Sequence, residues 1–243
     1  MNVRTMAVAA VLLAAGTGGQ VMGAGIDDFN SQMVPVVAPA TAFSDGWDLP
    51  VPYNGTVVYS ETSLAGVLGG TRQTTGINHD DRVDVDLLST SLYEYIALST
   101  AGWDSDSYGE LKLLYNGGGG GGGLNLNMSG WPSLGADFDP DHVGYQKATV
   151  MSFTLDDGLN SATVSRSWTT YISPFPRTLV TFNVSEFTAA NPSLDLSSID
   201  SILFTFESDR AGDIAFYGII PEPATLSLLA LGGLALIRRR RAA

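Results

Sequence analysis

The sequence predicts an all-β protein: an antiparallel β-sandwich, jelly-roll-like, flanked by an N-terminal signal helix and a C-terminal hydrophobic helix. Three observations predict it. Between the two ends, apolar and polar residues alternate with period two in many short segments, which is typical of strands that bury one face. Clusters of Gly, Asn, Asp and Pro separate these segments, as turns separate strands. No part of this central region keeps a helical period for more than about ten residues.

The predicted strands follow one another closely along the chain. Met151, Phe153 and Leu155, for example, alternate with Ser152 and Thr154. The predicted strands cover residues 56–60, 83–87, 92–98, 110–115, 123–128, 151–155, 162–171, 180–184, 202–206 and 214–219. Roughly 195 residues lie between the two ends, which suffices for one double-layered core. We see no internal repeat and no linker that would divide this region.

Seven consecutive glycines, residues 117–123, interrupt the predicted strands. Glycine has the greatest backbone freedom, so this segment is expected to be a loop or a hairpin end. A phosphate-binding loop would need a Lys and a Ser or Thr at the start of a helix. Leu124, Asn125 and Leu126 follow instead, and they do not fit that role.

The N-terminus has the composition of a secretory signal peptide. Arg4 precedes an apolar run at residues 6–15, and small or polar residues follow through Gly25. This order matches the charged, apolar and cleavage regions of such signals, so we expect cleavage near Gly23 and Ala24 by signal peptidase. An uncleaved anchor is the alternative, but about ten apolar residues are short for a membrane span. The predicted units are therefore 1–24, 25–220 and 221–243.

The C-terminus contains three parts in a fixed order. Pro221, Glu222 and Pro223 come first, and an apolar segment at residues 224–237 follows. The basic cluster Arg238, Arg239, Arg240 and Arg241 then precedes two alanines. The apolar segment is short for a hydrocarbon core that needs about 20 residues. The arginines favour a cytoplasmic position for the chain end. An ordinary short membrane anchor is the plainest interpretation.

This C-terminal order resembles the PEP-CTERM sorting signal. The resemblance rests on the Pro-Glu-Pro motif, the Gly232-Gly233 pair in the apolar segment and the terminal arginines. It covers only about the last tenth of the chain. It implies an exported protein, held transiently in the inner membrane, that an exosortase-type membrane protease releases to the cell surface or the extracellular matrix. Bacteria that make extracellular polysaccharide carry this signal on many exported proteins. The signal implies sorting and leaves the activity of the central region open.

The central region resembles other exported β-sandwich proteins that carry this tail. Asp27-Asp28-Phe29 is followed some forty residues later by Gly69-Gly70-Thr71-Arg72, and Gly212-Asp213-Ile214 precedes the motif. The arrangement is similar to galactose-binding-like jelly rolls, an architecture of many carbohydrate-binding modules. The resemblance implies a fold more than a ligand.

Charge and cysteine content exclude several classes of function. Residues 25–220 contain 7 basic and 24 acidic residues, a net charge of −17. So acidic a region repels phosphate backbones, which argues against nucleic-acid binding. The chain has no cysteine, so it has no disulfide framework, cysteine-based zinc site or thiol nucleophile.

Three acidic segments are candidates for a calcium site. Asp137, Asp139 and Asp141 stand at alternate positions, and carboxylate oxygens suit Ca²⁺. The glycine and glutamate that an EF-hand loop requires are missing, so a solvated acidic loop is the alternative. Asp104 and Asp106, and the turn at residues 78–81, are weaker candidates of the same kind. No other cofactor is expected.

Aromatic residues are candidates for a glycan platform, because the C–H faces of sugar rings pack on aromatic planes. Trp168, Tyr171 and Phe175 lie within eight residues, next to two prolines. Exposed aromatic clusters mark binding sites, whereas core packing is the commoner position of Trp.

No catalytic motif is present. The sequence has neither Gly-x-Ser-x-Gly nor His-Glu-x-x-His, and any glycosidase-like pair of carboxylates depends on the fold. We therefore expect an exported, non-catalytic β-sandwich that associates with polysaccharide. A structural surface protein without a glycan ligand, and a polysaccharide hydrolase or lyase, are the alternatives.

Overall fold

The computed structural model describes the strands, one helix and some of the connections between them. The described residues are 26, 46–51, 55–62, 64, 67–79, 85–90, 95–100, 108–117, 123–140, 149–168, 178–209 and 213–221. Both predicted terminal helices, the signal peptide and all of the sorting motif after Pro221 lie outside this set.

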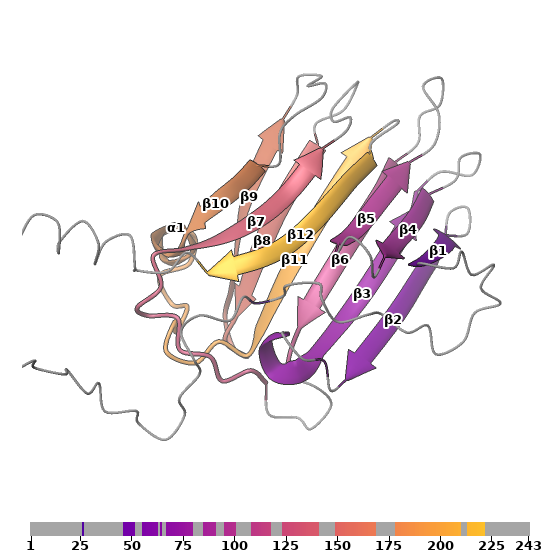
Figure 1. Ribbon diagram of the computed structural model, residues 1–243. Coiled ribbons are helices and arrows are strands. Elements are labelled where there is room, and N and C mark those ends of the chain that lie inside the picture. The colour runs from indigo at the N-terminus through magenta and orange to yellow at the C-terminus, as the bar shows by residue number, and fades with distance from the viewer. Residues whose placement is uncertain are drawn as a thin grey trace, which may run out of the picture.

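Two six-stranded antiparallel sheets form a β-sandwich (Figure 1). Sheet A has the strand order β1-β4-β5-β12-β7-β10, and sheet B has the order β2-β3-β6-β11-β8-β9. The chain moves repeatedly from one sheet to the other, as in a jelly roll. The predicted fold class is thereby confirmed.

Sheet A contains β1 (Gly46–Val51), β4 (Val85–Thr90), β5 (Tyr95–Thr100), β7 (Ser133–Pro140), β10 (Thr178–Asn183) and β12 (Asp213–Pro221). Sheet B contains β2 (Thr56–Thr62), β3 (Thr71–Asn78), β6 (Tyr108–Tyr115), β8 (Thr149–Asp156), β9 (Ser161–Trp168) and β11 (Ser201–Asp209). A 3₁₀ turn, η1 (Leu68–Gly70), and one helix, α1 (Val184–Ala190), complete the described elements.

Phenylalanines from both sheets form the centre of the core. Phe204 of β11 lies 5.0 Å from Phe153 of β8 and 5.1 Å from Phe216 of β12, measured between ring centroids. Phe182 of β10 lies 4.9 Å from Phe153. All four rings are fully buried, and their tilted or edge-to-face geometry is the favoured one for aromatic pairs. The inward-facing side chains of β8, β10, β11 and β12 therefore bring these rings together between the sheets.

Three predicted elements differ from the structure. Residues 123–128 form no strand and contribute a single bridge between Leu126 and Ile199. Residues 180–184 are strand only as far as Asn183, because Val184 begins α1. Residues 137–140, interpreted as part of an acidic loop, belong to β7. The segment was interpreted from the acidic face of β7, at Asp137 and Asp139, although Leu134, Ala136 and Phe138 alternate with it and are buried in the core.

β12 changes the face that its residues present partway along its length. The register with β7 shifts between Phe216 and Gly218, which leaves Tyr217 as the extra residue of a β-bulge. Phe216 and Ile219 are consequently both fully buried, although they are three positions apart. Strict alternation would have placed them on opposite faces.

The two ends of the sandwich differ in the elements that they contain (Figure 1). We call one end the Pro221 pole, because β12 ends there, and it also holds α1 and the β8–β9 turn at residues 157–160. The backbone N–H of Ile26 donates to the carbonyl of Ile219 at 2.8 Å, and the Ile26 side chain is buried. Residues close to both predicted processing sites therefore meet at this pole.

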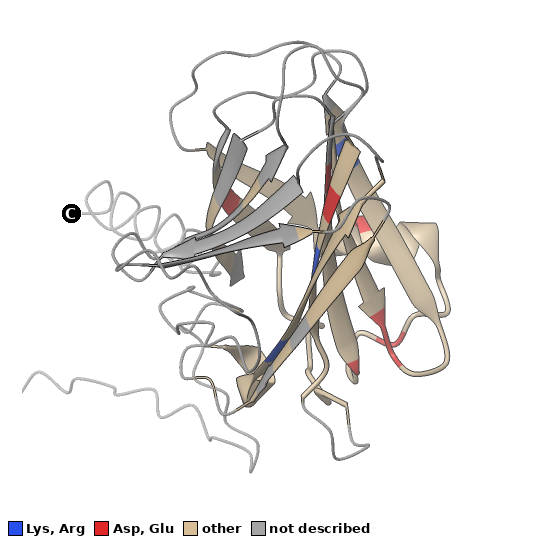
Figure 2. Ribbon diagram, turned by 90° about the vertical axis from the view of Figure 1, so that its right-hand side faces the viewer, with Lys and Arg blue, Asp and Glu red and all other residues tan. Residues whose placement is uncertain are grey.

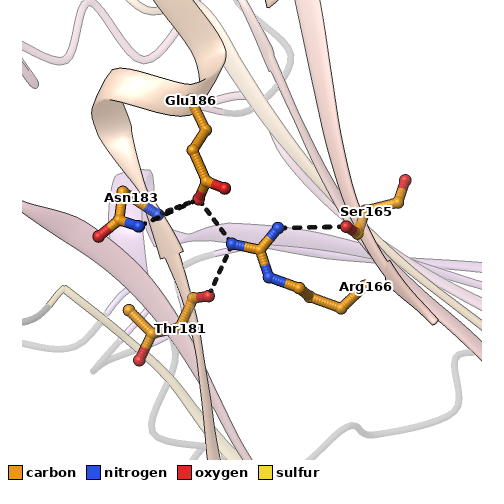
Figure 3. Close-up of polar contacts among 5 residues, drawn as sticks. All are labelled: Ser165, Arg166, Thr181, Asn183 and Glu186. Atoms are coloured by element: carbon orange, nitrogen blue, oxygen red, sulfur yellow. Dashed lines mark hydrogen bonds and ion pairs between the residues drawn. The ribbon is translucent and has the colours of Figure 1, made fainter. Parts of the chain in front are cut away.

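An arginine beside α1 joins the outer strands of the two sheets (Figure 3). Arg166 of β9 donates to Glu186 Oε2 at 2.6 Å and to the Thr181 carbonyl at 3.1 Å. Its guanidinium carbon lies 4.8 Å from the centroid of the Phe182 ring. Glu186 Oε2 also accepts the backbone N–H of Asn183, at 2.8 Å, at the start of α1. Because β9 and β10 are edge strands of different sheets, these bonds hold the sheets together along one side.

Candidate functional site

The opposite end of the sandwich, which we call the His79 pole, gathers the ends of strands from the whole sequence. Asn78 at the end of β3 pairs with Gly109 near the start of β6. Asp209 at the end of β11 pairs with Tyr108. The ends of β7 and β9, and the start of β12, lie at this pole as well (Figure 1). The strands that flank all three acidic segments of the sequence therefore end here.

A cluster of five side chains lies at this pole, on the face of sheet B that points away from sheet A. We call it the His79 cluster, and its members are His79, Tyr108, Glu110, Lys112 and Glu207. Alternation on β6 places three of them on this face, because the intervening Leu111 and Leu113 are fully buried in the core. Glu207 lies on β11, where it is the Cα partner of Glu110. Side chains in such a pair are direct neighbours.

Side-chain donors contact both carboxylates of the His79 cluster. Lys112 Nζ lies 2.9 Å from Glu110 Oε1, and His79 Nε2 lies 3.4 Å from Glu110 Oε2. The Tyr108 hydroxyl donates a hydrogen bond to Glu207 Oε2. The rings of His79 and Tyr108 are 4.8 Å apart, with an angle of 37° between their planes. The cluster is one connected set of polar and aromatic groups.

The members of the His79 cluster differ in their access to solvent. The side chain of Glu110 is 11% exposed, that of Lys112 is 34% exposed and that of His79 is 41% exposed. Tyr108 and Glu207 are half-buried. A solute can therefore reach the ring of His79 and the ammonium of Lys112 directly, and it meets Glu110 beneath them.

Hydroxyl-bearing residues surround the His79 cluster on the same face. Thr75 of β3 and Thr205 of β11 flank Lys112 on its two sides in the register. Further along the sheet, Thr154 of β8 and Thr163 of β9 share a hydrogen bond of 2.7 Å between their hydroxyl oxygens. The face therefore offers hydroxyls beside the carboxylates and the aromatic rings.

Few basic residues occur in the described part of the chain, where the cations are Arg72, Lys112 and Arg166 (Figure 2). Arg72 is buried within the sandwich and has a partner. Arg166 is bound to Glu186, and Lys112 to Glu110. None of the three is free to pair with an acidic ligand without giving up a contact.

Carboxylates at the Pro221 pole have a different environment. Asp157 accepts backbone N–H groups from Asp195, Asn160 and Leu159, and these bonds lower its pKa from 3.8 to about 2. The guanidinium of Arg166, followed by the backbone N–H of Asn183, lowers the pKa of Glu186. Hydrogen bonds to the charged form have this effect. These carboxylates hold the fold together at that pole.

The predicted glycan platform falls mostly outside the described residues. Trp168 is the last residue of β9, where its backbone pairs with Thr149. Tyr171 and Phe175 lie in an undescribed segment. The platform stays a prediction, and its chain segment begins at the same pole as the His79 cluster.

The predicted calcium ligands are also divided by the limits of the described chain. Asp137 is half-buried in β7, between Leu179 and Gly218 in the register. The backbone of Asp139 pairs with Ala215, and Asp141 lies outside the described residues. Among the described residues, no three His, Asp or Glu side chains are placed to hold a metal ion. Calcium binding stays a prediction.

Sequence reasoning missed the His79 cluster as a unit. His79 was noted only as part of an acidic turn, and residues 110–115 only as a strand. The available signal was the polar face of that strand, because Tyr108, Glu110 and Lys112 alternate with leucines. No local signal in the sequence indicates Glu207 as a member, because Glu207 lies 99 positions from Tyr108, its hydrogen-bond partner.

Comparison with known proteins identifies the C-terminus. Residues 220–241 match the PEP-CTERM protein-sorting motif, so the chain is that of an exported protein sorted through the membrane, and the motif implies exosortase processing. β12 includes Ile220 and Pro221, so the motif begins inside the last strand. Within the described ranges, the structure contains no helix with the length and apolar character of a membrane span.

Solved carbohydrate-binding modules resemble this chain in architecture. A family 11 module from Clostridium thermocellum, solved with a β-1,3-1,4-mixed-linked tetrasaccharide, is 14% identical with a TM-score of 0.33, covering 75% of this chain and 91% of the module. A module described as specific for non-crystalline cellulose is 12% identical with a TM-score of 0.38, covering 79% of this chain and 97% of the module. A family 30 module of a cellulase from Clostridium thermocellum is 13% identical with a TM-score of 0.33, covering 71% of this chain and 95% of the module. No curated protein matches the chain.

Proposed function

We propose that this exported protein reaches the cell surface or the extracellular matrix and associates there with polysaccharide, without catalysis, through the His79 cluster. The N-terminal segment serves in this proposal as a signal peptide that signal peptidase removes. Before exosortase processing, the C-terminal helix anchors the chain in the membrane.

One observation carries the proposal. The two carboxylates Glu110 and Glu207 face outward side by side, and the described groups that contact them are the side chains of His79, Lys112 and Tyr108. Sugar hydroxyls are uncharged hydrogen-bond donors like the Tyr108 hydroxyl, and they can replace side-chain donors without unfolding backbone structure. The rings of His79 and Tyr108 supply apolar surface for a sugar face.

The position of the cluster suits an attached protein. β12 ends at the Pro221 pole, so the sorting motif leaves the sandwich at the end opposite the His79 cluster. Attachment through that motif leaves the His79 pole open toward the matrix. The polysaccharide that surrounds such cells is then the ligand nearest to the cluster.

Two alternatives are distinguished by measurement. A structural surface protein would have the same sorting signal and no glycan affinity. A hydrolase would use a carboxylate pair on opposite sides of a scissile bond, and Glu110 and Glu207 are the outward-facing pair that the register brings together.

The test is affinity electrophoresis of the purified full chain in mild detergent, through gels that contain diverse polysaccharides, including the matrix of the producing cell. Retardation that Tyr108→Ala abolishes, with an unchanged melting temperature, is the expected result. Glu61→Gln, on the edge strand β2, serves as the control. Trp168→Ala combined with Tyr171→Ala tests the predicted platform in parallel. Absence of retardation in every gel favours the structural alternative, and release of reducing ends favours the hydrolase.

A further inference from the structure

We propose that the His79 cluster selects glycans that carry free amino groups, such as de-N-acetylated amino sugars, over N-acetylated and uronate glycans. This inference rests on the proposed polysaccharide binding and names the chemical class of its ligand.

The two carboxylates of the cluster are unequally neutralised. Glu110 has the ammonium of Lys112 at 2.9 Å. Glu207 receives only the uncharged hydroxyl of Tyr108 among the described residues. Its nearest cross-strand neighbour is Glu110, which carries the same charge, and like charges directly opposite one another are unfavourable. An ammonium group placed beside Glu207 would relieve that repulsion.

The surrounding charge favours the same ligand class. The three described cations are all engaged, and residues 25–220 carry a net charge of −17. A uronate polysaccharide would approach against this charge and would find no free cation in the described part of the site. An amine-bearing glycan is attracted at long range, and at Glu207 it meets a carboxylate that none of the three described cations contacts.

Hydrogen bonding explains why the amine, and not merely a neutral sugar, is preferred. A charge-assisted bond between an ammonium and a carboxylate is about twice as strong as a bond between neutral groups. A sugar hydroxyl at Glu207 would replace the Tyr108 hydroxyl with another uncharged donor. An ammonium replaces it with a charged and therefore stronger donor.

The experiment compares three short oligosaccharides of equal length by calorimetric titration of the full chain at mildly acidic pH. The probes are a glucosamine oligomer, the same oligomer after N-acetylation, and an oligouronate. We expect the glucosamine oligomer to bind about tenfold more tightly than its N-acetylated form, which is the difference between one charged and one neutral hydrogen bond. The oligouronate should bind most weakly.

Matched variants separate the site from general attraction between opposite charges. Glu207→Gln should reduce the preference for the amine to about twofold or less, while Glu61→Gln, which removes the same charge from the edge strand β2 of the same sheet, should leave it unchanged. Equal losses in the two variants would mean that overall charge alone attracts the amine, and the inference would be overturned.

The outcomes also separate this inference from the proposed function. If the N-acetylated oligomer binds as tightly as the glucosamine oligomer, amine selection is wrong and polysaccharide binding stands. If none of the three probes binds, and no polysaccharide retards the chain in gels, both proposals fail.

Discussion

The Pro221 pole and the His79 pole both concentrate carboxylates, but they use them in different ways. At the Pro221 pole, Asp157 accepts three backbone N–H groups, and Glu186 joins α1 to Arg166. At the His79 pole, Glu110 and Glu207 are contacted by the side chains of His79, Lys112 and Tyr108. A backbone donor cannot leave without local unfolding, whereas a side-chain donor can turn away.

The type of hydrogen-bond donor distinguishes carboxylates that stabilise the fold from carboxylates that can bind a ligand. A carboxylate that satisfies backbone groups at a turn or a helix start contributes to the stability of the fold. A carboxylate that faces only side chains contributes little to it and remains available to a ligand. Substitutions at the Pro221 pole should therefore lower stability, and those at the His79 pole should change binding.

The largest effect is expected from Phe187→Ala at the Pro221 pole. Phe187 anchors α1 and is fully buried, so its removal leaves a cavity and should lower the free energy of unfolding by about 4 kcal/mol. Denaturant titration measures it. A loss below about 1 kcal/mol would show that α1 is peripheral to the core.

Ile26→Ala should have the next largest effect. Ile26 is 1% exposed and is tied by its backbone to Ile219 and Leu68. We expect a loss of about 3 kcal/mol in the free energy of unfolding, measured in the same way. An unchanged stability would mean that the Ile26 side chain contributes nothing to the core, and that the contact between Ile26 and Ile219 does not stabilise the fold.

Arg166→Leu tests the connection between the two edge strands. The variant removes the bonds to Glu186 and Thr181 but retains apolar contact with Phe182. Because the Arg166 side chain is 30% exposed, solvent compensates part of the loss, and we expect a cost of about 1 kcal/mol. Asn183 continues to donate to Glu186, so α1 should persist in hydrogen exchange. If the backbone amides of α1 lose their protection from hydrogen exchange in Arg166→Leu, Arg166 is required for the helix itself.

Asp157→Asn sharpens the comparison through pH. The pKa of Asp157 is lowered from 3.8 to about 2, so its contribution to stability is complete above the unfolded pKa and is lost as the pH falls through about 2. The melting temperature of the variant should be lower than that of the wild type at neutral pH, and the gap should narrow from about pH 4 downward. A gap that stays constant with pH would mean that the ionised carboxylate is not the stabilising form.

Glu207→Gln should have the smallest effect on stability. Glu207 accepts one side-chain hydroxyl and lies opposite another carboxylate, so the change in free energy of unfolding should stay within about 0.5 kcal/mol. Thermal unfolding measures it beside the binding experiment. A large loss would place Glu207 with the structural carboxylates and remove the contrast between the poles.

Several features were available from the sequence because they depend on neighbouring residues. Alternation at 151–155 and 202–206 predicts strands that become β8 and β11, since the two-residue period of a strand is a property of the local backbone. The sorting motif was recognisable because all its parts are contiguous. The net negative charge follows directly from the numbers of acidic and basic residues in the sequence.

Other features required the register of the sheets. The bulge at Tyr217 reverses the faces of β12, and no local pattern marks it. The strand at residues 133–140 carries aspartates at 137 and 139 that are typical of a loop, but it pairs with β12 on one side and β10 on the other. These neighbours supply the hydrogen bonds that make the segment a strand.

The sequence by itself thus determined the class of fold, the route of export and the charge of the molecule. The tertiary structure alone decided which carboxylates accept backbone N–H groups and which are contacted by side chains. The physical reason is that local periodicity follows from the covalent geometry of a strand, whereas the contact between Glu110 and Glu207 follows from how twelve strands pair. The register of a strand is set by which of its two faces is buried against the core. It therefore depends on all residues of the strand, and neither glutamate determines it alone.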